Sequence, residues 1–299
     1  MQHDNDKTNG ARQSTGVPGL DRLLGGGLIP GTLTVIVGAT GIGKTQLALQ
    51  YANEGAAREG CRGVIFDLST RGDSQSHGEY TRRMFSWEME QTDRQSQATG
   101  PAVFQTRRQG DYLHVFDGVG RGVSRGNVNV DTWHDWQAIL NARLEATIAF
   151  LYGAFIGGAQ RVVVDGIEPV DRPDESVQLE LFQYVYHQIV RKRADWVARD
   201  LLRQDYRGNQ EQVERHHYDA EKIGCLLMQT SRESMLEELI SRPLDQGDLL
   251  SGANTVIYMG KLRDGKKISR GLYIAKHRGS VCEESIATYE IDDAGLRMA

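Results

Sequence analysis

The residues best suited to chemistry form one glycine-rich run. The sequence reads Gly38-Ala39-Thr40-Gly41-Ile42-Gly43-Lys44-Thr45, which fits the pattern G-x-x-x-x-G-K-S/T in full. Glycines let a backbone wrap closely around phosphate oxygens and point its N–H groups at them. We expect Lys44 to reach the β- and γ-phosphates of a nucleotide and the Thr45 hydroxyl to ligate Mg²⁺. The run predicts a site for ATP and Mg²⁺ that comprises Gly38, Ala39, Thr40, Gly41, Ile42, Gly43, Lys44, Thr45 and Gln46.

A strand and a helix must hold this loop on either side. The β-branched run Leu33-Thr-Val-Ile-Val37 precedes it and is typical of a buried strand. The residues after it, TQLALQYANEGAAREG, favour a helix that ends near Glu59-Gly60. The N-terminal end of such a helix adds its positive dipole to a phosphate site. This context supports phosphate binding over a chance match among the 34 glycines.

A second apolar run supplies a carboxylate for the metal. Arg161-Val-Val-Val-Asp165 has the Walker-B pattern, in which a buried strand delivers a carboxylate to the magnesium site. Asp165 is therefore predicted to bind Mg²⁺ together with Thr45. Gln229 and Thr230 follow another strand-like run, where they either sense the γ-phosphate or form an ordinary turn.

The composition is that of a globular protein. Hydrophobic residues make up 39% and charged residues 25%, and no stretch reaches the roughly 20 apolar residues that cross a bilayer. The polar first residues do not have the pattern of a secretory signal, so a cytoplasmic protein without membrane contact is expected. The net charge of −5 gives no general attraction to nucleic acid, so any such contact needs a local basic patch.

Strand-like and helical segments alternate along the chain. Further strands are expected at 63–68, 112–116, 223–228, 255–259, 271–275 and 286–291, and Asp264-Gly265 predicts a hairpin. The alternation predicts an α/β fold with a mostly parallel sheet, helices on both faces and an antiparallel hairpin at one edge. We expect residues 1–13 to be a disordered tail and 14–299 to be a single domain, with a long helical stretch over 176–220.

The chain resembles the KaiC/RadA branch of the RecA-superfamily ATPases at both ends. The opening segments Thr15–Asp21, Leu24–Gly27 and Pro30-Gly31 are similar to that branch, and Lys276-His277-Arg278-Gly279-Ser280 resembles its K-x-R-G-S motif. The middle matches poorly, which implies insertions near 86–131 and 191–220. The resemblance implies a RecA-like core in a ring, usually a hexamer, with ATP at each interface. Lys276 and Arg278 would then approach the γ-phosphate of the neighbouring subunit's nucleotide, as an arginine finger does.

One departure from the family affects hydrolysis. KaiC-like ATPases usually place two glutamates after the second strand, where one polarises the attacking water, whereas this chain has Ser69 and Thr70 there. Losing a general base typically costs about 10²–10⁴ in rate. Asp67, Asp73 or Glu168 would have to substitute, and Glu168 is the best placed because it follows Asp165 closely.

Three functions remain open at this point. The first is a slow ATPase of KaiC type that signals to an unidentified protein partner, and the second is a scaffold in which ATP only joins subunits. The third, less favoured given the acidic net charge, is a DNA-acting recombinase relative, whose loop would carry Arg107, Arg108, Arg121 and Arg125. Ser251 precedes the strand expected at 255–259, roughly where KaiC-type proteins carry a phosphate-accepting Ser/Thr pair. An ordinary turn serine is the favoured interpretation.

Overall fold

A nine-stranded sheet organises the protein. The computed structural model describes residues 12–69, 77–92, 100–105, 110–116, 130–169, 176–242 and 248–299, and for 130–142 and 248 it describes the backbone alone. The strand order is β3-β2-β4-β5-β1-β6-β7-β8-β9. The strands are β1 Leu33–Gly38, β2 Val64–Asp67, β3 Tyr112–His114, β4 Arg161–Ile167, β5 Gly224–Thr230, β6 Thr255–Asp264, β7 Lys267–His277, β8 Ala287–Asp292 and β9 Gly295–Met298.

The six strands from β3 to β6 are parallel, and β7, β8 and β9 continue the sheet in antiparallel fashion. Every residue of β1 and β4 is buried, as expected of central parallel strands covered on both faces. The predicted α/β class, the mostly parallel sheet and the antiparallel hairpin around Gly265 are therefore confirmed. The short strand β9 was not predicted, because its sequence Gly-Leu-Arg-Met has no β-branched residue.

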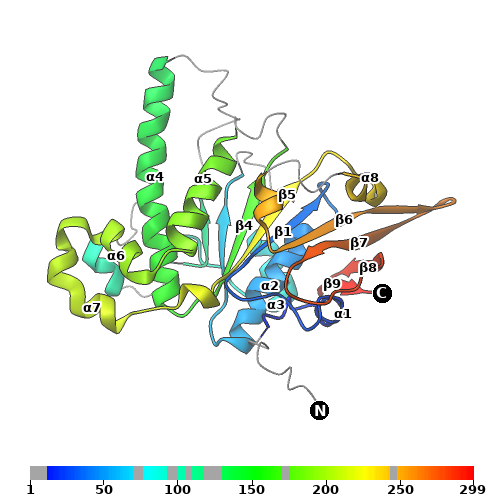
Figure 1. Cartoon of the computed structure of the whole chain (residues 1–299), viewed down its shortest axis with the longest axis horizontal. Helices are drawn as coiled ribbons and strands as arrows, with labels where there is room; N and C mark the ends of the chain where they lie inside the picture. Colours follow the sequence, from blue (N-terminus) through cyan, green and yellow to red (C-terminus); the bar gives the residue numbers. More distant parts are fainter. Residues whose placement is uncertain are drawn as a thin grey trace, which may run out of the picture.

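Helices cover both faces of this sheet (Figure 1). The α-helices are α1 Pro18–Leu23, α2 Lys44–Arg58, α3 His77–Phe85, α4 Val130–Ile156, α5 Val177–Val185, α6 Ala194–Leu202, α7 Gln210–Arg215, α8 Leu236–Ile240 and α9 Asp248–Gly252. The remaining turns of helix are η1 Gly100–Phe104, η4 Tyr186–Val190, η5 Arg203–Asn209 and η6 Ala220–Lys222. Helices α1 and α2 pack on one face, where Leu20 and Leu47 join the same apolar cluster as Ile36 of β1.

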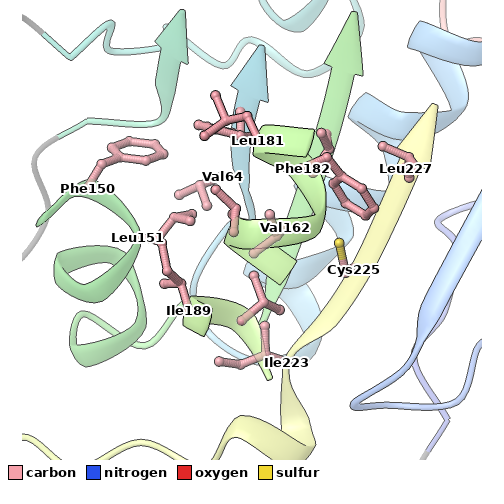
Figure 2. Close-up of a cluster of buried hydrophobic side chains, with 14 of the residues drawn as sticks. Val64, Phe150, Leu151, Val162, Leu181, Phe182, Ile189, Ile223, Cys225 and Leu227 are labelled. Carbon is pink, nitrogen blue, oxygen red and sulfur yellow. The ribbon is translucent and has the colours of Figure 1, made fainter. Parts of the chain in front are cut away.

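The opposite face carries the larger apolar cluster. Figure 2 shows Leu151 of α4 and Phe182 of α5 pointing toward the strand side chains Val64, Val162 and Cys225. These strand residues alternate with residues that face α2, such as Ile65 and Val163, because successive side chains of a strand point to opposite faces. Each face of the sheet therefore has its own apolar layer.

Two segments differ from the expectations. The stretch 176–220 is not one long helix, because a π-helical turn over Tyr186–Val190 leads into a break before Ala194 and α6 ends at a 3₁₀ segment. Packing of α4 against both α6 and η4 overrides the helical propensity there. Ordered structure begins before residue 14, since Gln13 is buried and its amide nitrogen donates to the carbonyls of Gln160 and Lys222.

Among the described residues, none of the helices combines the length and the apolar character that a membrane span requires.

Candidate nucleotide site

The glycine-rich run lies between β1 and α2, at the carboxyl edge of the parallel strands. Gly43 has a φ of +111° and Gly41 a φ of +76°, values that side-chain-bearing residues rarely adopt. A Cβ on Gly38 would lie 2.5 Å from the carbonyl oxygen of Met259, so this position also excludes a side chain. The backbone conformation explains why the motif needs glycine at these three positions.

Residues of the C-terminal strand β8 contact this loop. The hydroxyl of Tyr289 in β8 donates to the carbonyl of Ile42 at 2.7 Å, and a Cβ on Gly43 would lie 2.5 Å from the Cδ1 of Ile291. Ile42 is itself buried, whereas Thr40 and Gly41 at the tip are exposed. The antiparallel extension of the sheet thus holds the phosphate loop in place, a role that the sequence did not suggest.

Lys44 points back into the loop. Its ammonium group donates to the carbonyl oxygens of Gly38 at 2.8 Å and Ala39 at 2.9 Å, and the side chain is buried. Burial lowers the pKa of Lys44 to about 8, and the charge of Asp165 opposes that shift. The ammonium is therefore at the loop that the sequence predicts to hold phosphate, within electrostatic reach of the predicted metal carboxylate.

Asp165 lies beside Asp67, because the two aspartates are register partners on the neighbouring strands β4 and β2. Both carboxylates are buried, and the imidazole of His77 lies between them. His77 Nε2 is 2.9 Å from Oδ2 of Asp165, and its Nδ1 is 4.0 Å from Oδ2 of Asp67. Because a carboxylate accepts, the Nε2–H of His77 is the donor to Asp165.

The carboxylate of Asp67 is held by further hydrogen bonds. Its Oδ2 accepts the hydroxyl of Tyr112 at 2.6 Å, and its Oδ1 accepts the backbone N–H of Ser69 at 2.8 Å. His114 Nε2 lies 2.8 Å from the carbonyl oxygen of Ser69. Asp67 is therefore a fixed, buried carboxylate next to the predicted metal ligand. Thr70 and Asp73 lie outside the described residues.

Sequence reasoning missed His77 and Tyr112. His77 is separated from Asp165 by 88 residues, and Tyr112 lies 45 residues from Asp67. Neither belongs to a motif with fixed spacing. The adjacency of β2, β3 and β4 brings them together, and the order of strands in a sheet is not encoded in a local pattern. For Tyr112, the one local signal was a side chain with a hydroxyl at the start of an expected strand.

The donor set fits a magnesium ion. Mg²⁺ prefers oxygen ligands and is usually held by one or two carboxylates together with phosphates and water, rather than by an all-protein cage. Thr45 at the start of α2 offers a hydroxyl and Asp165 a carboxylate, whose Oδ1 accepts the N–H of Gly166 at 2.7 Å. Among the described residues, no group of three or more His, Cys, Asp or Glu side chains forms a closed metal site. These residues would leave ligand positions for phosphate and water.

Glu168 lies in a cavity at the carboxyl ends of β1, β4 and β5. It lines this cavity of about 320 Å³ together with Gln229, Thr230, Glu233 and Arg242. This cavity also contacts Leu179 and Tyr258, which belong to the apolar cluster on the face opposite α2. The structure therefore brings Glu168 together with the predicted sensor residues Gln229 and Thr230, while Asp165 and Asp67 face the α2 side with His77.

Lys276 and Arg278 contact their own chain. The ammonium of Lys276 donates to the carbonyl oxygens of Leu250 at 3.0 Å and Ser251 at 2.8 Å, and Arg278 donates to Ser251 at 3.2 Å. Burial, followed by the charge of Arg278, lowers the pKa of Lys276. Both cations lie at the C-terminal end of α9, where unpaired helix carbonyls attract positive charge.

Comparison with known proteins relates these features to a family of ATPases. A family model described as "ATPase: KaiC" matches residues 13–111, which include the phosphate loop and β2. The circadian clock oscillator protein KaiC of Rippkaea orientalis is 36% identical over 81 residues, covering 27% of this chain and 14% of that protein. The DNA repair protein RadA of Mycolicibacterium smegmatis is 52% identical over 42 residues, covering 14% of this chain and 9% of that protein. The matched part is thus a small fraction of each relative.

A solved structure extends the comparison over the whole fold. The KaiC-like protein of Pyrococcus horikoshii OT3 aligns with 96% of this chain and 98% of its own, at a TM-score of 0.50 and 17% identity. At that identity the likeness concerns the fold. Taken with the matches around the phosphate loop, it confirms the resemblance seen in the sequence. Residues 13–111 thus match a KaiC ATPase family, and the chain resembles the KaiC/RadA-like, ATP-binding P-loop proteins of the RecA superfamily.

Proposed function

We propose that this protein is a slow, Mg²⁺-dependent ATPase that works as an oligomer and gates contact with a protein partner. The observation that carries this proposal is the geometry of the phosphate loop between β1 and α2, where the buried ammonium of Lys44 donates to the carbonyl oxygens of Gly38 and Ala39. Lys44 would bind the β- and γ-phosphates, and Thr45 and Asp165 would hold the ion. The ion would neutralise charge on the transferring phosphoryl group.

Slow turnover is proposed because no carboxylate occupies the position of Ser69. That serine is buried, and its backbone N–H donates to Asp67. Both carboxylate oxygens of Asp67 already accept hydrogen bonds, one from the N–H of Ser69 and one from the hydroxyl of Tyr112. Glu168 remains the candidate base, acting from the cavity it shares with Gln229. A missing or displaced base is expected to reduce the rate by about 10²–10⁴.

An oligomer, with a hexameric ring as the expected form, is proposed from Lys276 and Arg278. In the single chain both cations bind carbonyls of α9, and Arg278 is exposed. In a ring they would exchange those carbonyls for the γ-phosphate of a neighbouring subunit, which is a stronger, charge-assisted interaction. Such an exchange would also release α9 and give a partner a nucleotide-dependent surface. The carbonyl of Ser251 accepts hydrogen bonds from both cations, and an ordinary turn serine stays the favoured interpretation of this residue, with phosphorylation as the alternative.

The test is phosphate release by the full chain with ATP and Mg²⁺, using Lys44→Ala as the control. We expect the wild type to release phosphate faster than Lys44→Ala, and Glu168→Gln to slow release while nucleotide binding persists. Equal rates for wild type and Lys44→Ala would reject the enzyme. Loss of ATP uptake by the wild type in calorimetry would reject nucleotide binding as well.

A non-hydrolysing scaffold is the second candidate, and the serine at position 69 favours it. Under this alternative ATP and a non-hydrolysable analogue would assemble the same oligomer, and assembly would persist for as long as nucleotide is present. Sedimentation with each nucleotide distinguishes the two, because an ATPase would disassemble or change shape as ATP is consumed. The loop arginines considered for a recombinase-like function, Arg107, Arg108, Arg121 and Arg125, lie outside the described residues.

A further inference from the structure

The tip of the β6–β7 hairpin concentrates positive charge. Residues 261–270, which we call the basic arm, contain one carboxylate, Asp264, and five cations: Lys261, Arg263, Lys266, Lys267 and Arg270. Since the whole chain has a net charge of −5, a charge of +4 on the basic arm leaves −9 on the rest. All five cations are exposed.

The basic arm extends beyond the neighbouring strands. Pairing of β6 with β1 ends at Met259, and pairing of β7 with β8 involves Arg270 to Leu272 only. Figure 1 shows the two strands continuing past the body of the sheet as a two-stranded ribbon. Four residues per strand beyond Gly260 correspond to about 13 Å at the usual rise of a strand. Leu236 of α8 packs on the face of the ribbon that carries Gly260 and Gly271, so the opposite face is the accessible one.

The strand register sorts the charges by face. Lys261 is paired with Arg270, and Arg263 with Ile268. Because directly opposed residues of an antiparallel pair lie on the same face, these three cations share a face with Ile268. The other face carries the pairs Leu262–Ser269 and Asp264–Lys267. The first face is thus uniformly basic, and its Ile268 side chain is 63% exposed.

This arrangement is unfavourable for the isolated hairpin. Like charges placed directly opposite, as Lys261 and Arg270 are, destabilise a strand pair. Within the part of the chain that the structure describes, no carboxylate forms an ion pair with the three cations of this face, and the only side-chain hydrogen bond among them is from Arg263 to the carbonyl of Gly265. An anionic partner would remove the repulsion.

We propose that the basic arm binds the major groove of double-stranded DNA, with Lys261, Arg263 and Arg270 on phosphates and Ile268 at its tip. The major groove of B-form DNA admits a two-stranded β-ribbon, whereas the major groove of duplex RNA is too narrow. Single strands are bound through aromatic side chains, and residues 261–270 contain none. Three of the five cations are lysines, which are depleted in contacts between proteins, so a second copy is the poorer match.

The test uses the full chain and a fluorescent DNA duplex of roughly 30 base pairs, about three helical turns. Binding is followed by anisotropy at about 50 and 200 mM salt, where phosphate contacts dominate the salt dependence. The triple variant Lys261→Gln, Arg263→Gln, Arg270→Gln should bind at least about tenfold more weakly at low salt. Its slope of log affinity against log salt should fall by about 2 to 3, since each lost phosphate contact contributes roughly 0.9.

A matched variant controls for net charge. Arg199→Gln, Arg207→Gln, Arg215→Gln removes three exposed arginines of the α6–α7 segment, and it should retain the wild-type affinity and slope. Thermal unfolding checks that both triples fold. The arm variant should unfold at the wild-type temperature or above it, because the repulsion between Lys261 and Arg270 is removed, whereas the other triple loses only surface contacts and should change little. The proposal fails if the wild type does not bind the duplex at low salt, or if both triples weaken binding equally. It also fails if the arm variant alters only the oligomeric state, or if a single strand binds more tightly than the duplex.

Discussion

The imidazole of His77 donates to the carboxylate of Asp165 at 2.9 Å, and it does so between two buried aspartates. A hydrogen bond to a metal-binding carboxylate fixes the orientation of its oxygens and typically contributes 10–100-fold to metal affinity. We therefore expect His77→Ala to raise the Mg²⁺ concentration for half-maximal nucleotide binding by about tenfold or more. His77→Gln, whose amide retains a donor near the position of Nε2, should restore much of the loss.

The measurement is a Mg²⁺ titration of nucleotide binding by calorimetry, with binding without metal as the internal control. Metal-free binding should be equal in wild type and both variants, because the imidazole of His77 lies against Asp165, Asp67 and Tyr112, and the phosphates are expected to bind the backbone of the loop and Lys44. An equal Mg²⁺ requirement in wild type and a stably folded His77→Ala would mean that His77 serves the packing of α3 alone.

Lys276 and Arg278 allow a mixing experiment. The Lys44→Ala subunit should bind no nucleotide, but it keeps Lys276 and Arg278. The Arg278→Ala subunit should bind nucleotide, but it lacks the guanidinium proposed to reach the neighbouring subunit's nucleotide. Each should be inactive alone. In rings that are mixed one to one, half of the sites bind nucleotide and half of those face an intact neighbour, so about a quarter of the wild-type phosphate release should return. Without any recovery, Arg278 acts within its own chain, where it holds α9.

Arg161 provides a stability test far from the phosphate loop. Its side chain is fully buried and forms two hydrogen bonds to Glu59, at 2.7 and 2.8 Å, besides donating to the carbonyls of Ser14 and Tyr51. Removing one partner of a buried ion pair typically costs about 3–5 kcal/mol. Arg161→Met should lower the free energy of unfolding in urea by about that amount.

Two further variants complete this test. Adding Glu59→Gln to Arg161→Met should recover part of the loss, since the carboxylate no longer lacks its partner. The exposed pair of Arg58 and Glu54 is the comparison, and Arg58→Met should leave unfolding unchanged. A small effect of Arg161→Met would contradict the view that this ion pair joins α2, β4 and the segment before α1.

His277 should make stability depend on pH. Its Nδ1 lies 2.9 Å from the hydroxyl of Thr255 and its Nε2 3.2 Å from the carbonyl of Leu24. Burial, followed by the charge of Arg12, lowers the pKa of His277, and the bond to Leu24 opposes the shift. Between this lowered pKa and the ordinary value near 6.5, the unfolded chain binds the proton more readily than the folded one. The contribution of His277 is therefore complete above about pH 6.5 and is lost as the pH falls further.

Urea unfolding between about pH 5 and 7 measures this effect as the slope of the unfolding free energy against pH. His277→Gln should reduce the slope, although it lowers stability at every pH because one buried hydrogen bond is lost. His217 is exposed, so His217→Gln should keep the wild-type slope. A slope that is identical in all three proteins would assign the acid sensitivity to other groups.

Much of the site was predictable because its signals are local. The phosphate loop needs glycine at positions 38, 41 and 43 for reasons of backbone conformation and close approach, and these leave a fixed spacing in the sequence. Asp165 was predictable because it directly follows the apolar run Val162–Val164, which is typical of a buried strand. In contrast, His77, Tyr112 and Asp67 come together only through the order of β2, β3 and β4, and no spacing records that order.

The same difference separates what the sequence determined from what the tertiary structure decided. The sequence by itself determined the α/β class, the phosphate loop with Lys44 and Thr45, and the absence of a glutamate at Ser69, because backbone geometry and burial impose patterns on neighbouring residues. The tertiary structure decided that Glu168 faces a cavity opposite α2, that Lys276 and Arg278 bind α9, and that strand register places Lys261, Arg263 and Arg270 on one face. Those contacts depend on pairings between distant segments, whose free energy is set by the packed sheet as a whole.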